Sequence, residues 1–348
     1  MSQSELRIVP LNDGLESAYQ DFVFAHPESM FFHSISYLRF LRQMLVADYN
    51  VLIALDADDR VQGVLSALIR YGALGKVINS LPYYGSNGGV LASNEIAARQ
   101  LVNTWNVLTG AVGVVSATMV SNPMAKVDYG CATRHDICDT RIGQITNIAY
   151  SDDHGAKLMN SYHYKTRNMV RKSQKQGFTV AIENSNVDFI RTVHRENMVA
   201  IGGRAKADSF FTIFPEHFHS DTDYQIWVAR SNGEPIAALL LFYYRDTVEY
   251  YMPVIKAEWR NRQPLSLLIF EAMCETSRRG FRLWNWGGTW ISQDGVYLFK
   301  KRWGAWECVY TYYTRVNDER LYATSREILL QEYPDFFVIP FNCLKEVA

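Results

Sequence analysis

Two stretches of sequence decide the fold: YNVLIALDADDRVQGVLSALIR at Tyr49–Arg70 and YQIWVARSNGEPIAALLLFYYR at Tyr224–Arg245. They overlay without a gap at a constant offset of 175 residues (224 − 49). In each stretch, alternating apolar residues lead into a polar turn, at Asp56–Arg60 and Ser231–Pro235, and then into a second apolar run. This pattern is typical of a β-hairpin, and its repetition predicts two copies of one structural unit.

The sequence after each hairpin repeats as well. A helix and then a strand are predicted at 94–109 and 112–120 in the first half, and at 264–279 and 281–286 in the second. Two unrelated hairpins would resemble each other in isolation, but they would not share this order of elements. We therefore interpret the chain as two tandem α+β domains. The predicted domains are 1–152 and 153–324.

Length and composition agree with two folded domains. The chain has 348 residues, 48% of them hydrophobic, and a typical domain has roughly 150 residues. Lys and Arg (35) nearly balance Asp and Glu (36), which argues against a dedicated DNA-binding or membrane-surface protein. No apolar run is long enough to span a membrane, and Met1–Asp13 is too polar for a secretory signal. We expect a cytoplasmic protein without a transmembrane segment.

Several familiar chemistries lack their motifs. The sequence contains no GxxxxGK[ST], GxGxxG, GxSxG or HExxH. Phosphoryl transfer on a P-loop, dinucleotide binding, serine hydrolysis and zinc proteolysis are therefore not indicated. The five cysteines are scattered without a CxxC pair, and no metal site is expected.

A basic segment joins the two halves. Residues 153–177 contain no Pro and are predicted to form one helix that ends at Gly177. On this helix the cations fall on one arc without acidic partners four residues away, which favours a phosphate-binding surface. An ordinary solvated face is the alternative interpretation. The cations are Lys165, Arg167, Arg171, Lys172 and Lys175.

Two polar segments interrupt apolar elements further along. The first is Arg260, Asn261, Arg262 and Gln263, directly before Pro264, which is preorganised for the first turn of a helix. Exposed N–H groups at a helix start, together with two arginines, favour an anion such as phosphate. An ordinary helix start with surface arginines explains the segment equally well.

The second segment is Trp284–Thr289, a strand that ends in Gly287 and Gly288. Glycines at a strand end let a ligand or another backbone approach closely, and Trp286 offers a flat apolar wall. Packing of at least one tryptophan in the core is the alternative.

A short helix is predicted at 294–304, capped by Asp294 and ended by Gly304. It places Lys300 near Phe299 in the phrase FKKRWG.

These segments, in this order behind the basic helix, resemble the Fem family of peptidoglycan-bridge aminoacyltransferases, whose phrase FKxxFG is close to FKKRWG. The resemblance covers most of the chain, and it extends to the less characterised acetyltransferases of exopolysaccharide gene clusters. Further similar stretches are KTRNMVRKSQKQGFTV (165–180), INSLPYYGSNGGV (78–90) and QPLSLLIFEAMCETSRRGF (263–281).

The resemblance implies two GNAT-type acyltransferase domains with a cleft between them, and a C-terminal tail, about 325–348, that packs back on the first domain. It implies transfer of an aminoacyl group from aminoacyl-tRNA to an amine of a nucleotide-linked cell-envelope precursor. Neither a metal nor a tightly bound cofactor would be needed. The resemblance implies the acceptor end of tRNA as a partner and does not imply DNA. Peripheral contact with a membrane is compatible with the resemblance.

The resemblance also implies roles for individual residues. By motif match, Lys300 would stabilise charge at the reacting ester, and Phe299 would line the acceptor or adenosine end. Ordinary GNAT enzymes carry a Tyr where this chain has Lys300, and Tyr297 lies one helical turn away as a possible proton donor. Arg39 and Arg204 are the nearest matches to the cationic residues that hold precursor phosphates in the family.

Two alternatives stay open. One is a CoA-dependent N-acyltransferase that acts on an amino sugar in polysaccharide biosynthesis. The other is a non-catalytic GNAT-like module that binds a nucleotide or polymer. Both enzymatic readings need an unprotonated amine, yet the sequence identifies no general base.

Overall fold

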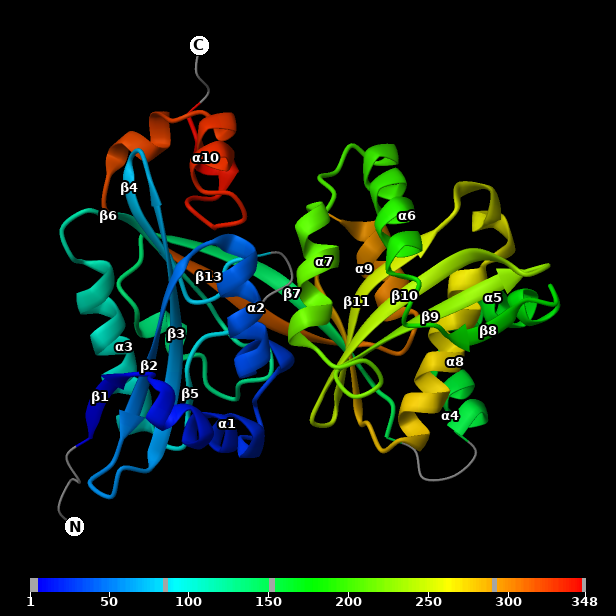
Figure 1. Cartoon of the computed structure of the whole chain (residues 1–348), viewed down its shortest axis with the longest axis horizontal. Helices are drawn as coiled ribbons and strands as arrows, with labels where there is room; N and C mark the ends of the chain where they lie inside the picture. The colour runs from blue at the N-terminus through cyan, green and yellow to red at the C-terminus, as the bar shows by residue number, and fades with distance from the viewer. Residues whose placement is uncertain (1–5, 84–86, 150–153, 290–292, 346–348) are drawn as a thin grey trace. The chain divides into compact units, whose positions relative to one another are not determined.

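The computed structural model of the chain describes residues 6–83, 87–149, 154–289 and 293–345 (Figure 1). Its contacts divide the chain into unit 1, Met1–Arg141 with Val309–Ala348, and unit 2, Ile142–Cys308. The borders fall inside strands β7 (Ile137–Asn147) and β13 (Trp306–Val316), and not near 152 and 324 as the sequence analysis placed them. Because each strand continues through its border, no change in composition marks the border.

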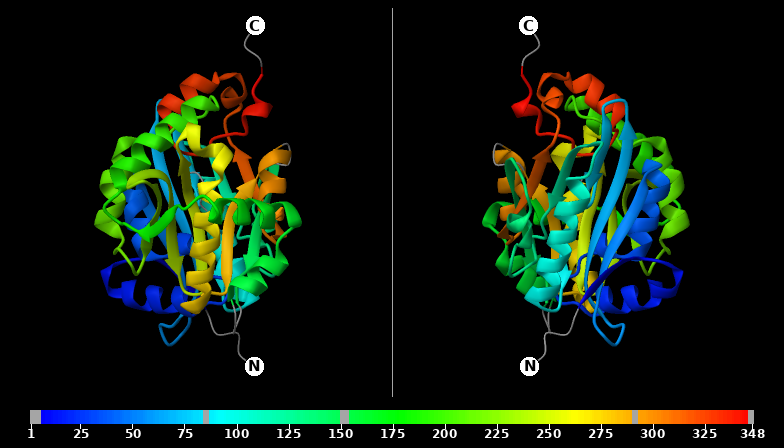
Figure 2. Two further views of the ribbon diagram at one scale, coloured as in Figure 1. Left: turned by 90° about the vertical axis from the view of Figure 1, so that its right-hand side faces the viewer. Right: turned by 90° about the vertical axis from the view of Figure 1, so that its left-hand side faces the viewer.

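Unit 1 is a mixed sheet whose helix α3 packs on one face (Figure 2). Strands β4 and β6 run parallel to each other, whereas the other neighbouring pairs are antiparallel. Asn94 caps α3, and Leu101 and Trp105 of this helix enter the core. The strands, in sheet order, are β1 (Arg7–Pro10), β2 (Asp48–Leu55), β3 (Val61–Gly72), β4 (Gly75–Asn79), β6 (Val114–Val120) and β13, with β5 (Leu91–Ala92) beside β3. The helices are α1 (Glu16–Ala25), α2 (Ile35–Leu45), α3 (Glu95–Thr109) and α10 (Arg326–Glu332).

Unit 2 repeats this plan. Strands β11 and β12 run parallel, and the hairpin β9–β10 and the pairs beyond it are antiparallel. The strands, in sheet order, are β7, β12 (Leu283–Thr289), β11 (Thr247–Ile255), β10 (Glu234–Tyr244), β9 (Tyr224–Ser231) and β8 (Thr179–Ile182). The helices are α4 (His154–Ser161), α5 (Tyr164–Gln174), α6 (Val187–Ala200), α7 (Asp208–His217), α8 (Pro264–Arg278) and α9 (Asp294–Lys301).

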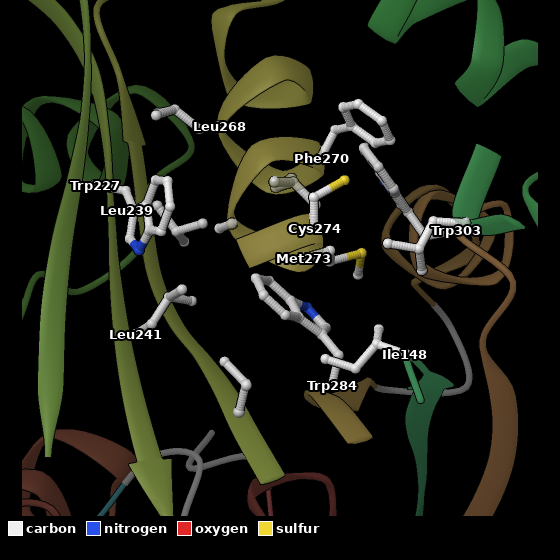
Figure 3. Close-up of a cluster of buried hydrophobic side chains, with 14 of the residues drawn as sticks. Ile148, Trp227, Leu239, Leu241, Leu268, Phe270, Met273, Cys274, Trp284 and Trp303 are labelled. Atoms are coloured by element: carbon white, nitrogen blue, oxygen red, sulfur yellow. The ribbon is translucent and has the colours of Figure 1, made fainter. Parts of the chain in front are cut away.

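The core of unit 2 forms between helix α8 and the sheet. Leu268 and Met273 of α8 share one buried cluster with Leu239 and Leu241 of β10 and with the fully buried Trp284 (Figure 3). Pro264 starts α8 at its first position, where a missing N–H costs nothing. The same hairpin-then-helix order that the sequence shows twice therefore builds both cores.

The predicted single helix over 153–177 is wrong. The structure contains α4 and α5, separated at Tyr162 and His163, while residues 150–153 lie outside the described ranges. The backbone N–H of His163 donates to the carbonyl of Arg302 (2.9 Å), and His163 Nδ1 accepts from the N–H of Lys165. A partner from a distant part of the chain thus replaces the helical hydrogen bond at this point.

The gapless overlay of the two hairpins also needs a correction. Leu52 pairs with Leu65 in unit 1, and Trp227 pairs with Leu239 in unit 2. The offset of 175 holds for the first strand but falls to 174 on the second, because the turn in unit 1 is one residue longer. A shift of one residue exchanges the faces of a strand, so the correct register decides which residues of the two units correspond.

Within the described ranges, none of the helices combines the length and the apolar character that crossing a membrane requires.

Candidate active site

Two parallel strands of unit 2 part after three residue pairs. Thr247–Glu249 of β11 faces Leu283–Asn285 of β12, and a register shift on β11 around Tyr251 follows immediately. On β12, pairing with β7 is irregular between Asn285 and Gly288, and Gly287 adopts a left-handed backbone (φ 70°) that favours glycine. Both strands therefore depart from regular geometry just after Glu249 and Asn285.

Glu249 is a buried carboxyl group at this point. It lies on the face of β11 opposite α8, since its neighbours Val248 and Tyr250 belong to the α8 core. Its Oε2 accepts a hydrogen bond from Asn285 Nδ2 (2.7 Å), while its buried Oε1 has no partner among the described residues. Burial raises the pKa of Glu249 to about 8. A carboxyl group with this pKa exchanges a proton near neutral pH.

Lys300 of α9 is buried beside the end of β12. Its Nζ donates to Thr289 Oγ1 (2.8 Å), to the carbonyl of Gly288 (2.9 Å) and, at 3.3 Å, to that of Gly287. Burial lowers the pKa of Lys300 to about 8. The ammonium group is thus held by neutral oxygens, without a carboxylate to neutralise it within the described part of the chain.

The two titratable groups belong to one hydrogen-bonded network. Asn285 Oδ1 accepts from the N–H of Gly287 (2.9 Å), whose carbonyl accepts from Lys300. The path therefore runs from Glu249 through Asn285 and Gly287 to Lys300, and we name these four residues the β12 network.

The two aromatic neighbours predicted on α9 have different surroundings. Phe299 is half-buried and packs on the rings of Trp286 and Trp303. The Tyr297 hydroxyl donates to Glu307 Oε1 (2.5 Å) and accepts from Lys301 Nζ (2.7 Å). These two exposed groups already hold the Tyr297 hydroxyl, and its role as a proton donor stays a prediction. Asp294 is the first residue of α9 and makes no capping bond.

Trp286 also differs from its prediction. It is buried, and its Nε1 donates to Thr146 Oγ1 (2.8 Å), so it packs in the core and offers no wall to a ligand. Gly287 and Gly288 do lie at the candidate site, where their carbonyls accept from Lys300.

The loop before α8 keeps its two arginines at the surface. Arg260 and Arg262 lie in a 3-10 helix (Ala257–Arg262), and the Arg262 guanidinium stacks on the Trp259 ring at 5.0 Å. Gln263 has a left-handed backbone, and its carbonyl accepts from the N–H of Ser266. Since Pro264 has no N–H, the first turn of α8 offers an anion fewer donors than an ordinary helix start.

The basic residues of α5 divide into two groups. Lys172 Nζ donates to the carbonyl of Asn261 (2.8 Å) and Arg167 to that of Tyr162 (2.5 Å), so both hold backbone in place. Arg171 is exposed. The structure thereby brings Lys172 and Asn261 together, while a phosphate site at this loop stays a prediction.

The two remaining cationic predictions lie elsewhere. Arg39 belongs to unit 1 and forms an ion pair with Glu16 at the surface. Arg204 lies in the exposed segment between α6 and α7 of unit 2. Among the described residues, no group of three or more His, Cys, Asp or Glu side chains could hold a metal ion.

Sequence reasoning missed Glu249 and Asn285. The available signal was a single acidic residue inside the apolar strand TVEYYMPVI, which is unusual for a strand buried on both faces. Only the register shows that Asn285 stands opposite it.

Comparisons with known proteins agree with this architecture. Residues 160–301 match the family model described as an acetyltransferase (GNAT) domain. A search of curated protein sequences finds no match to this chain.

Solved structures show the same fold over almost the whole chain. The crystal structure of FemX superposes with a TM-score of 0.71 at 14% identity, covering 91% of this chain and 98% of that one. A tandem GNAT protein from the clavulanic acid biosynthesis pathway gives 0.54 at 12% identity, covering 90% and 98%. The C-terminal domain of a putative lysylphosphatidylglycerol synthetase from Agrobacterium fabrum gives 0.56 at 11% identity, covering 94% and 100%.

At such identities the likeness shows the fold alone. It agrees, at that level, with the Fem-type resemblance in the sequence. Residues 160–301 are thus similar to an acetyltransferase domain of the GNAT type, and the chain has the α+β fold of tandem GNAT proteins.

Proposed function

We propose that the protein is an N-acyltransferase that moves an aminoacyl or acyl group to an amine of a cell-envelope precursor, such as a nucleotide-linked muropeptide. The β12 network carries this proposal: a buried lysine and a buried glutamate meet through Asn285 and Gly287 where two strands part. The GNAT domain match and the fold shared with FemX support acyl transfer.

Acyl transfer requires the site to stabilise an oxyanion and to accept a proton from the amine. The amine nitrogen attacks the carbonyl carbon of an ester or thioester, and a C–N bond forms. The C–O or C–S bond then breaks, and the leaving oxygen or sulfur takes up a proton in exchange for the one that the amine has lost. The tetrahedral oxyanion between these events needs a fixed positive donor, which we assign to Lys300. The amine must lose a proton, which we assign to the unpartnered Oε1 of Glu249.

Lys300 can serve the oxyanion only by exchanging a hydrogen bond. All three of its N–H groups have acceptors in the protein, and the bond to the Gly287 carbonyl is the longest, at 3.3 Å. We propose that this bond is the one exchanged for the substrate oxygen. If no exchange occurs, Lys300 only holds the strand end, as a non-catalytic binding module would allow.

Both candidate donors, aminoacyl-tRNA and acyl-CoA, carry phosphates. We assign these to the loop at Arg260 and Arg262, which is tethered through Asn261 to Lys172 of α5, with the exposed Arg171 on the same helix. Positive charge at a helix start favours phosphate.

An acyl-CoA donor, with an amino sugar as acceptor, is the second candidate function. The acetyltransferase description of the matched family favours it. The proline at the start of α8 counts against it, because a pyrophosphate seated there would miss one backbone N–H.

Thermal-shift titrations with acetyl-CoA, CoA, UDP-linked amino sugars and UDP-linked muropeptides separate these functions. A ligand at 100 times its dissociation constant stabilises by about 2.7 kcal/mol. Stabilisation by the muropeptide without an effect of CoA supports an aminoacyl-tRNA donor, whereas stabilisation by CoA supports the second candidate. If none of these ligands raises the melting temperature, the result contradicts both enzymatic functions.

Transfer assays with the responding ligands then test Lys300. We expect Lys300→Met to lower the transfer rate roughly 100- to 1,000-fold, since it removes the donor to the oxyanion. Lys301→Met is the matched control, because Lys301 lies next along α9 but is exposed and paired with Glu307. Full activity of Lys300→Met would contradict the assignment.

A further inference from the structure

A pocket of unit 2 is lined by residues outside the β12 network. The pocket, of about 580 Å³, lies between helix α8 and β8, the outermost strand of the sheet. This volume is within the range of small-molecule sites. Figure 1 shows α8, α5 and β8 in this part of unit 2.

The floor of the pocket is apolar and partly aromatic. It is lined by Phe178, Val180 and Trp227 from the sheet side, and by Leu267 from α8. The indole N–H of Trp227 points to the Tyr243 hydroxyl (3.4 Å), and Figure 3 shows the ring beside Leu239. A ligand in the pocket therefore needs an apolar body.

The wall of the pocket carries acidic residues on one stripe of α8. Glu271 and Glu275 follow Leu267 at intervals of four residues, which places all three on one side of the helix. Glu275 forms an ion pair with Arg278 at 2.8 Å. Glu271 is half-buried and has no hydrogen bond or ion pair within the described residues. Glu271 therefore has no directly bound cation beside the apolar floor, and Arg278 acts on its charge only at longer range.

We propose that this pocket binds a small organic ammonium ion with an aromatic or aliphatic body, and that Glu271 is its counter-ion. Removing a carboxylate from water without a partner is unfavourable, and an ammonium group would restore the lost interaction. Phe178 and Trp227 line the pocket, and aromatic side chains attract such cations. Burial raises the pKa of Glu271, although the charge of Arg278 acts in the opposite direction.

A metal ion or an anion fits this pocket less well. Only two carboxylates line it, one of them already paired, and the described residues hold no group of metal ligands. An anion would meet Glu271 and would gain only Arg278, which is engaged by Glu275. The proposal does not depend on acyl transfer.

Titration with phenethylammonium chloride tests the proposal, with 2-phenylethanol as the neutral probe of the same shape. Binding is followed by NMR at the Trp227 indole N–H, assigned with Trp227→Phe. We expect the ammonium to bind roughly tenfold more tightly than the alcohol, and Glu271→Gln to abolish this preference. Arg278→Gln removes a competing cation, so it should tighten ammonium binding.

Two controls separate this site from other effects. Glu234→Gln alters an exposed glutamate in the β9–β10 turn, outside the pocket, and should leave binding unchanged. Lys300→Met should also bind the ammonium normally, even if acyl transfer is lost or was never present. Equal affinity for ammonium and alcohol, or unchanged ammonium binding in a folded Glu271→Gln variant, would overturn the proposal.

Discussion

The two units place different side chains at corresponding positions of the repeated fold. In unit 1, Leu68 faces Asn79 on β4, and Asn79 pairs with Thr118 on β6. In unit 2, Phe242 faces Glu249, and Glu249 pairs with Asn285. With the offset of 174 between Leu68 and Phe242, Asn79 corresponds to Glu249 and Thr118 to Asn285.

In unit 1 the C-terminal tail satisfies these polar groups. Asn79 Oδ1 accepts from the N–H of Phe337 (2.7 Å), and Asn79 Nδ2 donates to the Phe337 carbonyl (2.9 Å). Thr118 Oγ1 donates to the same carbonyl at 3.4 Å. A peptide segment of the protein thus occupies the position, and no polar group of Asn79 is left for a substrate.

In unit 2, none of the described segments satisfies the corresponding carboxyl group. Glu249 Oε1 stays buried without a partner among the described residues, next to a network that ends at a buried lysine. Buried polar atoms without partners are rare in folded proteins and are costly to keep. The difference supports the proposal that unit 2, and not unit 1, holds the chemistry.

The largest effect on stability is expected when the pH is changed, because Glu249 and Lys300 of unit 2 are both buried. In the folded protein the pKa of Glu249 is raised from 4.5 to about 8. Its stabilising contribution to the free energy of unfolding is therefore complete below pH 4.5 and is lost as the pH rises to 8. In the folded protein the pKa of Lys300 is lowered from 10.5 to about 8. Burying its charged form destabilises the fold, and this destabilisation disappears as the pH rises from 8 to 10.5. We expect the free energy of unfolding of unit 2 to pass through a minimum near pH 8, with changes on the order of 3 kcal/mol.

Tryptophan fluorescence in urea measures this curve, because Trp105 is the one tryptophan in unit 1 and the other seven belong to unit 2. Glu249→Gln should remove the decrease in the free energy of unfolding below pH 8. Lys300→Met should remove the increase above pH 8. A curve that is unchanged in both variants would contradict the assigned pKa values.

The tail contact of unit 1 gives the next prediction. Asn79→Leu leaves the N–H and carbonyl of Phe337 without their main partner, which should lower the free energy of unfolding by about 2–4 kcal/mol. Phe337→Leu is the control, because it keeps both backbone bonds and removes only the ring contact with Tyr312. A larger loss in the control than in Asn79→Leu would show that the ring, not the amide pairing, holds the tail.

The smallest effect is expected at Gly287. Its positive φ disfavours a side chain, although a Cβ there would meet no atom within 4 Å. Gly287→Ala should therefore cost about 1–2 kcal/mol of stability. A Gly295→Ala variant provides the comparison, since Gly295 lies in α9 with open space and no positive φ. Equal stability of the two variants would mean that the backbone of β12 relaxes.

The sequence predicts the repeat, the hairpins and both core helices, because hydrophobic periodicity survives in each. It does not predict the interruption at His163, since the backbone partner there is Arg302, far along the chain. The importance of Lys300 follows from a phrase in the sequence, but that of Glu249 depends on a one-residue difference between two turns. Register and burial are tertiary properties, and they identify the Glu249–Asn285 pair.

The most direct test of the account is single-turnover acyl transfer by Glu249→Gln and Asn79→Ala, measured below the melting temperature of each. Glu249→Gln keeps an oxygen for Asn285 but accepts no proton, and the account predicts a rate lower by roughly 100-fold or more. Asn79→Ala should transfer at the rate of the unmodified protein. A normal rate for Glu249→Gln, or a loss confined to Asn79→Ala, would contradict the claim that unit 2 holds the chemistry.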